Sequence, residues 1–198
     1  ALDCTVKLPQ IEHNQHEIST PDVIYQIVKD TPIELPALLA MWLSLTESEI
    51  LGLTKSKSIS SDGCYITIKE VIVKDEHNNA VVKNKGKQPT RDRTLRLPEY
   101  LKQLIDKVET DQLVTLSGTA LSKRFNRLIT KAGIPHMTFH DLRHVNASVM
   151  AVLRIPDKYA QERGGWKTDH IMKSTYMQTF SSERAAIDNQ IDQYTQDT

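Results

Sequence analysis

A short stretch of alternating residues lies between two long segments whose apolar residues have helical spacing. From residue 65 to residue 73, side chains alternate between two faces with a period of two, which is typical of a β-strand. Two further short strands are expected at residues 80–83 and 94–97, after polar turns at residues 75–79 and 85–92. The chain is therefore expected to be mainly α-helical with one small antiparallel β-sheet, an α+β fold.

Three helices are expected before this sheet. Thr20 and Pro21 are typical of an N-cap and a first helical position, and four apolar residues then share one face: Val23, Ile24, Ile27 and Val28. The second helix is expected to open at Pro36 and to run to about residue 45. The third is expected to be capped by Ser44 or Thr46 and to end at Gly52.

Helical spacing returns after the sheet. Amphipathic stripes are expected over residues 100–108 and 121–129, and shorter helices around residues 159 and 171. Another helix is expected to begin at Thr138, whose hydroxyl would cap it while Asp141 lies three residues on, as in a capping box.

The length and composition are those of one globular domain. Apolar residues make up 39% of the 198 residues and charged residues 25%, and no apolar run approaches the roughly 18 residues of a membrane span. Cys4 and Cys64 have no metal or redox spacing, which favours a reducing cytosol. We expect a linker or leader at residues 1–18, one domain at residues 19–180 and a tail helix at residues 181–198.

Cations are clustered although the formal net charge is zero. Between residues 83 and 96 there are six cations and one anion, and residues 123–131 add four cations with no acid. Ordinary solvated surface charge is the simpler interpretation of either cluster. Together they favour a DNA-facing side, with these predicted DNA contacts: Lys85, Arg91, Arg93, Lys123, Arg124 and His144.

Four chemically useful side chains follow one another within 37 residues: His140, Arg143, Trp166 and Tyr176. Exchange of a phosphodiester bond needs a nucleophile, cationic donors for the phosphoryl oxygens and a proton carrier. His140 and Arg143 are three apart at the start of a helix, where free amides and the helix dipole favour a bound phosphate. A helix cap with a surface arginine is the simpler alternative for that pair.

A second alternative is a metal site. His144 follows His140 by four residues, a spacing that suits two ligands of one metal ion. The residue after His140 is Asp141 rather than Glu, and no third ligand is evident. We therefore expect no metal, and a metal-dependent hydrolase remains the weaker hypothesis.

These residues resemble the catalytic motifs of the tyrosine recombinase family, particularly integrases of temperate phages and mobile elements. The matching segments are His-Asp-Leu-Arg-His at 140–144, Arg-Gly-Gly-Trp at 163–166 and Tyr176. The family pattern is His-x-x-Arg, then Gly followed by His or Trp, then the nucleophilic tyrosine about ten residues later. The resemblance covers nearly the whole chain and implies the C-terminal catalytic domain of such a protein, here an isolated fragment.

The resemblance implies a role for each residue. Tyr176 would attack a DNA phosphate, giving a 3′-phosphotyrosyl intermediate and a free 5′-hydroxyl. Arg143 would bind the phosphoryl oxygens, His140 would assist proton transfer, and Trp166 would donate its indole N–H or pack the site. A lysine in the turn between the second and third strands would protonate the leaving oxygen. Lys87 is the expected residue, with Lys85 as the alternative, and no cofactor is required.

One position departs from the family pattern. The family has a first catalytic arginine in a segment resembling Gly-Leu-Arg-x-Ser-Glu-Ile-Leu-Gly-Leu, and Thr46 stands at that arginine's place, with Glu49 matching. Loss of one such donor commonly costs about 10²–10³ in rate. Three interpretations are open. The missing cation could come from elsewhere in the chain, the enzyme could be weakened, or the chain could be an inactive DNA-binding relative. We favour the first, because the other expected positions are filled.

The resemblance also implies partners and a location. Double-stranded DNA is the expected partner, with a homotetramer on DNA and a monomer or weak oligomer when isolated. No membrane contact is expected, and the location would be the bacterial cytoplasm, associated with the nucleoid. The apolar tail residues Ile187, Ile191 and Tyr194 could dock on a neighbouring subunit or on their own domain. A type IB topoisomerase shares the chemistry and is the nearest alternative.

Overall fold

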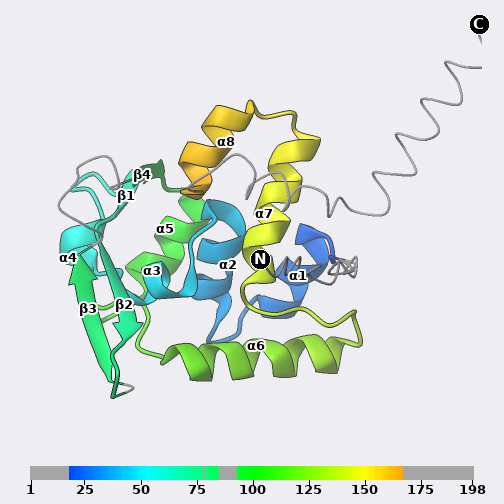
Figure 1. The fold of residues 1–198 in the computed structure, drawn as a ribbon, viewed down its shortest axis with the longest axis horizontal. Coiled ribbons are helices and arrows are strands. Elements are labelled where there is room, and N and C mark those ends of the chain that lie inside the picture. Colours follow the sequence, from blue (N-terminus) through cyan, green and yellow to red (C-terminus); the bar gives the residue numbers. More distant parts are fainter. Residues whose placement is uncertain (1–17, 78, 85–92, 167–198) are drawn as a thin grey trace, which may run out of the picture.

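The computed structural model describes residues 18–77, 79–84 and 93–166. Figure 1 shows helices surrounding a central helix, with the strands at one side. The helices are α1 (Pro21–Val28), α2 (Glu34–Leu43), α3 (Glu47–Leu51), α4 (Lys55–Ser58), α5 (Glu99–Asp106), α6 (Gly118–Ala132), α7 (Asp141–Val152) and α8 (Asp157–Gly164). The strands are β1 (Tyr65–Ile68), β2 (Glu70–Lys74), β3 (Ala80–Asn84) and β4 (Arg93–Arg96).

The core is organised around α2. Nine of its ten residues are buried, and it lies between α5 and α7 (Figure 1). Each outer helix buries one stripe against this centre: α6 buries Leu121, Phe125 and Ile129. A helix that is apolar on all sides must be covered on all sides, so α2 acts as the scaffold to which the other helices attach.

The alternating segment forms two strands instead of the expected one. The ladder breaks at Lys69: β1 pairs antiparallel with β4, and β2 pairs antiparallel with β3. The described residues therefore form two two-stranded sheets where one small sheet was expected. Ile66 and Ile68 of β1 are buried, whereas every residue of β2 is at least partly exposed. The alternation continues through Lys69 without a change of period, so the sequence gives no sign of the break.

The end of α2 differs from the expectation in a way that shapes the site. The helix runs from Glu34 to Leu43, and Ser44 follows in the left-handed region with φ 57°. Ser44 therefore terminates α2, and Thr46 caps α3. The Thr46 hydroxyl accepts from the Glu49 amide at 3.4 Å, and the Glu49 carboxylate accepts from the Thr46 amide at 2.8 Å. This reciprocal pair is a capping box.

The start of α7 is also corrected. The helix begins at Asp141 with His140 as its N-cap, three residues later than expected. The Thr138 hydroxyl does not accept from a helix amide. The Asp141 carboxylate accepts from both the amide and the hydroxyl of Thr138, at 2.7 and 2.9 Å. The carboxylate thus orders the turn that leads into α7.

Other expectations have mixed outcomes. Thr20 and Pro21 do begin α1, but Val23, expected on its buried face, is 42% exposed. Ile18, placed in the leader, is buried in the core. The expected helix around residue 171 and the tail at 181–198 lie outside the described residues. Within the described ranges, no helix is long and apolar enough to cross a membrane.

Candidate active site

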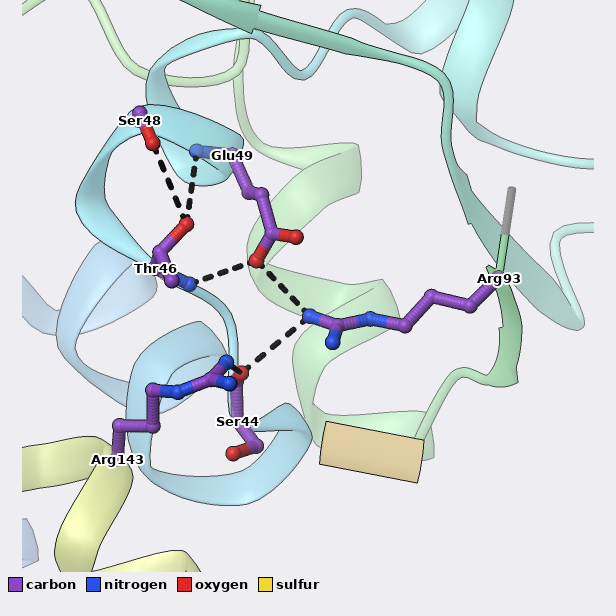
Figure 2. Close-up of polar contacts among 6 residues, drawn as sticks. All are labelled: Ser44, Thr46, Ser48, Glu49, Arg93 and Arg143. Atoms are coloured by element: carbon purple, nitrogen blue, oxygen red, sulfur yellow. Dashed lines mark hydrogen bonds and ion pairs between the residues drawn. The ribbon is translucent and has the colours of Figure 1, made fainter. Parts of the chain in front are cut away.

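Arg143 projects from α7 into the end of α2. Its side chain is buried, and its Nη1 donates to the carbonyl oxygen of Ser44 (Figure 2). The carbonyls in the last turn of a helix have no partner within the helix, so they are available to a donor from another element. Because α7 packs along α2, the third residue of α7 meets the carbonyl that follows α2.

A second arginine arrives at the same carbonyl from the strands. Arg93, the first residue of β4, donates from Nη2 to the Ser44 carbonyl at 3.3 Å and to Glu49 Oε2 at 2.8 Å (Figure 2). The Arg93 side chain is 10% exposed and that of Glu49 is 5% exposed. Two guanidinium groups therefore meet at one oxygen in a nearly dry site.

Positive charge exceeds negative charge among these buried groups. Burial, followed by the nearby charge of Arg93, lowers the pKa of Arg143 to about 10, while Glu49 opposes the shift. Burial also lowers the pKa of Arg93, with Glu49 opposing and Arg163 adding to the effect. Arginine stays protonated at such values, so the shifts indicate that the cations are incompletely compensated. An anion bound here would relieve that imbalance.

The two glycines before Trp166 allow the turn to pack on both arginines. Gly165 has φ 65°, and a Cβ at this position would clash with Arg93 Nη1. A Cβ on Gly164 would clash with the indole ring of Trp166. The ring is buried, and its centroid lies 4.7 Å from Arg143 Cζ, a cation–π contact. Residues without a side chain at 164 and 165 thus allow the backbone to approach these groups closely.

The two histidines occupy the outer part of α7. His140 is exposed at the N-cap, and its ring meets that of His144 edge to face with centroids 5.2 Å apart. Burial, followed by the charge of His140, lowers the pKa of His144, so its imidazole is neutral at pH 7. Its Nε2 lies 3.9 Å from Asp141 Oδ1. His140 is thus accessible to a ligand, and its ring packs against that of His144.

Nothing in the described part of the chain favours the metal interpretation. No three His, Cys, Asp or Glu side chains among those residues are arranged to hold a metal ion. The arrangement of Arg143, Arg93, Trp166 and His140 instead offers N–H donors and positive charge, which suits an oxyanion such as a phosphate.

Comparison with known proteins identifies the family. A model described as the phage integrase family matches residues 47–183, which is more than half of the chain. The chain belongs to the phage integrase family. The family resemblance inferred from the residues at 140–144, 163–166 and 176 is therefore confirmed.

Relatives of this integrase-family chain extend the comparison. A curated relative, "Integrase" of Saccharopolyspora erythraea, is 33% identical over 67 residues, which cover 34% of this chain and 15% of the relative. Among solved structures, the Tn1549 transposon integrase in complex with transposon right-end DNA has a TM-score of 0.71 at 17% identity, covering 96% of this chain and 73% of that one. XerA recombinase has a TM-score of 0.67 at 16% identity, covering 93% and 68%.

The catalytic domain of bacteriophage HP1 integrase is similar to this chain over nearly its whole length. Its TM-score is 0.57 at 15% identity, and the match covers 87% of this chain and 94% of that domain. At such low identity these structures establish the fold. The expected fold class, a mainly helical tyrosine recombinase catalytic domain, is confirmed, with two small antiparallel sheets in place of the one expected.

The remaining predicted residues fall into two groups. Tyr176, Lys85, Lys87 and Arg91 lie outside the described residues. Lys123 and Arg124 are exposed on α6, which Figure 1 shows on the opposite side of the molecule from α8. They do not join the cluster at Ser44, and their predicted DNA contacts concern another part of the surface.

The sequence alone did not reveal the roles of Arg93, Glu49 and the Ser44 carbonyl in this cluster. Arg93 was predicted to be a DNA contact within a cationic run, and the structure places it in a buried ion pair. One signal was present: Arg93 and Leu95 are two residues apart on a strand, and Leu95 is buried. Side chains two apart on a strand share a face, so a strand that begins at Arg93 places its side chain on the same face as Leu95.

Proposed function

We propose that this chain cuts and rejoins DNA as the catalytic domain of a site-specific recombinase. The observation that carries the proposal is the convergence of Arg143 and Arg93 on one carbonyl oxygen, beside Trp166. This is a preformed site for an oxyanion, and the family to which the chain belongs supplies the reaction.

In the proposed first step, the Tyr176 phenol gives its proton to His140, its oxygen forms a bond to a DNA phosphorus, and the bond from phosphorus to the 5′-oxygen breaks. The products are a 3′-phosphotyrosyl link and a 5′-hydroxyl, whose proton comes from Lys87. Arg143 donates to the non-bridging oxygens as their charge builds, and His140 and Trp166 hold the same group. Attack by another 5′-hydroxyl reverses the step, so no hydrolysis occurs and no external energy source is needed.

The proposed partner is double-stranded DNA, with four copies assembled for strand exchange and a monomer or weak oligomer in isolation. Related structures support the DNA partner: the Tn1549 integrase is in complex with transposon DNA, and a lambda integrase dimer is bound to a core site. The bacterial cytoplasm, in association with the nucleoid, is the proposed location. The match spans only 15% of the length of the curated relative.

Covalent trapping tests the proposal. The probe is a pool of random-sequence duplexes with nicks, in which the short 5′-hydroxyl fragment produced by cleavage diffuses away and prevents rejoining. We expect a protein–DNA adduct that survives denaturing detergent, and its complete loss in Tyr176→Phe. Tyr159→Phe is the matched control, because Tyr159 is exposed on α8 and should retain full yield. DNA binding without any adduct would reject the enzyme.

A second candidate function is favoured by Thr46. An inactive relative that only binds DNA would lack the cation normally found at this position, as this chain does. Such a protein would bind the duplex pool normally in the same assay and leave no adduct. Relaxation of supercoiled DNA in the absence of strand exchange would instead indicate a type IB topoisomerase.

A further inference from the structure

Position 46 contributes no positive charge to the cluster. The Thr46 hydroxyl accepts from the Glu49 amide and lies 3.3 Å from Ser48 Oγ, so the side chain serves the start of α3. The family pattern places an arginine here. A cation close to the phosphate, if one is needed, must come from a different element.

Arg93 lies against the residues that flank Thr46. Its Nη2 bonds to the carbonyl of Ser44 and to the Glu49 carboxylate oxygen that also accepts from the Thr46 amide (Figure 2). Arg93 thus reaches the segment between α2 and α3 from β4, 49 residues along the chain from Ser44. The guanidinium lies next to Arg143, which donates to the same carbonyl.

Most of the donor capacity of Arg93 is unused. Among the described residues, its Nε and Nη1 are buried and have no hydrogen-bond partner. An arginine that serves only to brace a buried pair usually has its donors satisfied, because an unpaired buried N–H is costly. The three unpaired N–H groups on these two nitrogens, beside a second incompletely compensated guanidinium, instead suit an anionic ligand.

We propose that Arg93 supplies the guanidinium missing at Thr46 and donates to the reacting phosphate together with Arg143. This inference rests on the proposed recombinase function and adds a catalytic residue to it. Glu49 holds Arg93 through Nη2, which leaves Nε and Nη1 for a non-bridging oxygen. Arg143 takes the other oxygen, so the two arginines share the charge that develops on the phosphorus oxygens during attack.

Neutralising the phosphate tests this assignment. The substrate is the nicked duplex recovered from the adduct pool, made once with an ordinary phosphate and once with an uncharged methylphosphonate at the cleaved position. For Arg93→Met on the phosphate we expect adduct formation to slow by about 10²–10³-fold. On the methylphosphonate, the rate of adduct formation by Arg93→Met should lie within about tenfold of that of the unsubstituted chain, because there is less charge to stabilise.

Control variants guard against a purely structural effect. Arg93→Met leaves Glu49 buried without this cation, so Arg93→Met combined with Glu49→Gln is tested alongside it, with thermal melting as the folding check. Arg154→Met removes an exposed arginine outside the cluster and should change neither rate. Arg93→Lys should recover part of the activity, since it keeps the charge without the planar fork.

The outcomes separate the two proposals. Equal deficits on both substrates, or no deficit at all, would make Arg93 a structural residue and overturn this inference while leaving the recombinase intact. If the unsubstituted chain forms no adduct with either substrate, the proposed function fails, and this inference fails with it.

Discussion

Arg143 and Arg93 hold like charges within reach of one carbonyl oxygen, and the Glu49 carboxylate pairs with Arg93. Burying such charges is unfavourable unless a partner is gained later. A free site of this kind is therefore prepared for an anion, and the binding of a phosphate releases electrostatic strain. Burial also affects the protonation of His144, whose pKa it lowers.

His144 should make stability depend on pH. Burial lowers its folded pKa below the ordinary 6.5, so between those two values the unfolded chain binds more protons than the folded one. The free energy of unfolding should therefore fall as pH decreases below 6.5, until the folded pKa is reached. Urea unfolding at a series of pH values measures this.

Two variants identify the source of that dependence. His144→Gln should flatten the decline, whereas His136→Gln, at an exposed position, should leave it unchanged. An identical slope in His144→Gln and the unsubstituted chain would assign the effect to another group.

Thr46→Arg distinguishes a lost cation from one that another element supplies. If Thr46 were merely a loss, the arginine would raise adduct yield at similar DNA affinity. Because Thr46 caps α3 and Arg93 already bonds to Glu49, we expect a stability loss of about 1 kcal/mol and no gain in yield. In an Arg93→Met background, Thr46→Arg should raise the yield. The yield of adduct on the nicked duplex is measured for Thr46→Arg and for Thr46→Arg combined with Arg93→Met. A higher yield in Thr46→Arg, without a higher yield in the combined variant, would show that Arg93 does not replace the missing arginine.

At the scale of elements, local patterns predicted what local physics controls. Thr20 and Pro21 begin α1 as expected, because a helix cap and a first-turn proline act over a few residues. The break at Lys69 was not predictable, since it depends on which strand each half meets. The start of α7 was misplaced because Asp141 orders the preceding turn instead of completing a capping box.

Gly165 joins α8 to Trp166, and a matched pair of substitutions isolates its contact. Gly165→Ala and Gly133→Ala both place a side chain at left-handed φ, 65° and 68°, which costs about 1–2 kcal/mol. At Gly133 nothing lies within 4 Å of the added Cβ, whereas at Gly165 the Cβ meets Arg93. Gly165→Ala should therefore lose about 1–3 kcal/mol more by thermal melting. Equal losses would show that Gly165 does not support Arg93.

At the scale of the whole molecule, the site is assembled by the packing of four elements. Ser44 follows α2, Arg93 begins β4, Arg143 lies in α7 and Trp166 follows α8. The contact from Arg143 to Ser44 joins residues 99 apart, and that from Arg93 joins residues 49 apart. The motifs at 140–166 were readable because they are local in the sequence. The pairing of Arg93 with Glu49 depends on tertiary packing, and only a weak strand-face signal pointed to it.

The central claim is that a tyrosine at position 176 becomes joined to DNA at a phosphate held by Arg143. Mass spectrometry of the trapped adduct, after digestion with nuclease and protease, tests it most directly. We expect a nucleotide linked through its 3′-phosphate to the peptide containing Tyr176, with a 5′-hydroxyl on the released fragment. A nucleotide attached to any other residue, or a link through a 5′-phosphate, would contradict it.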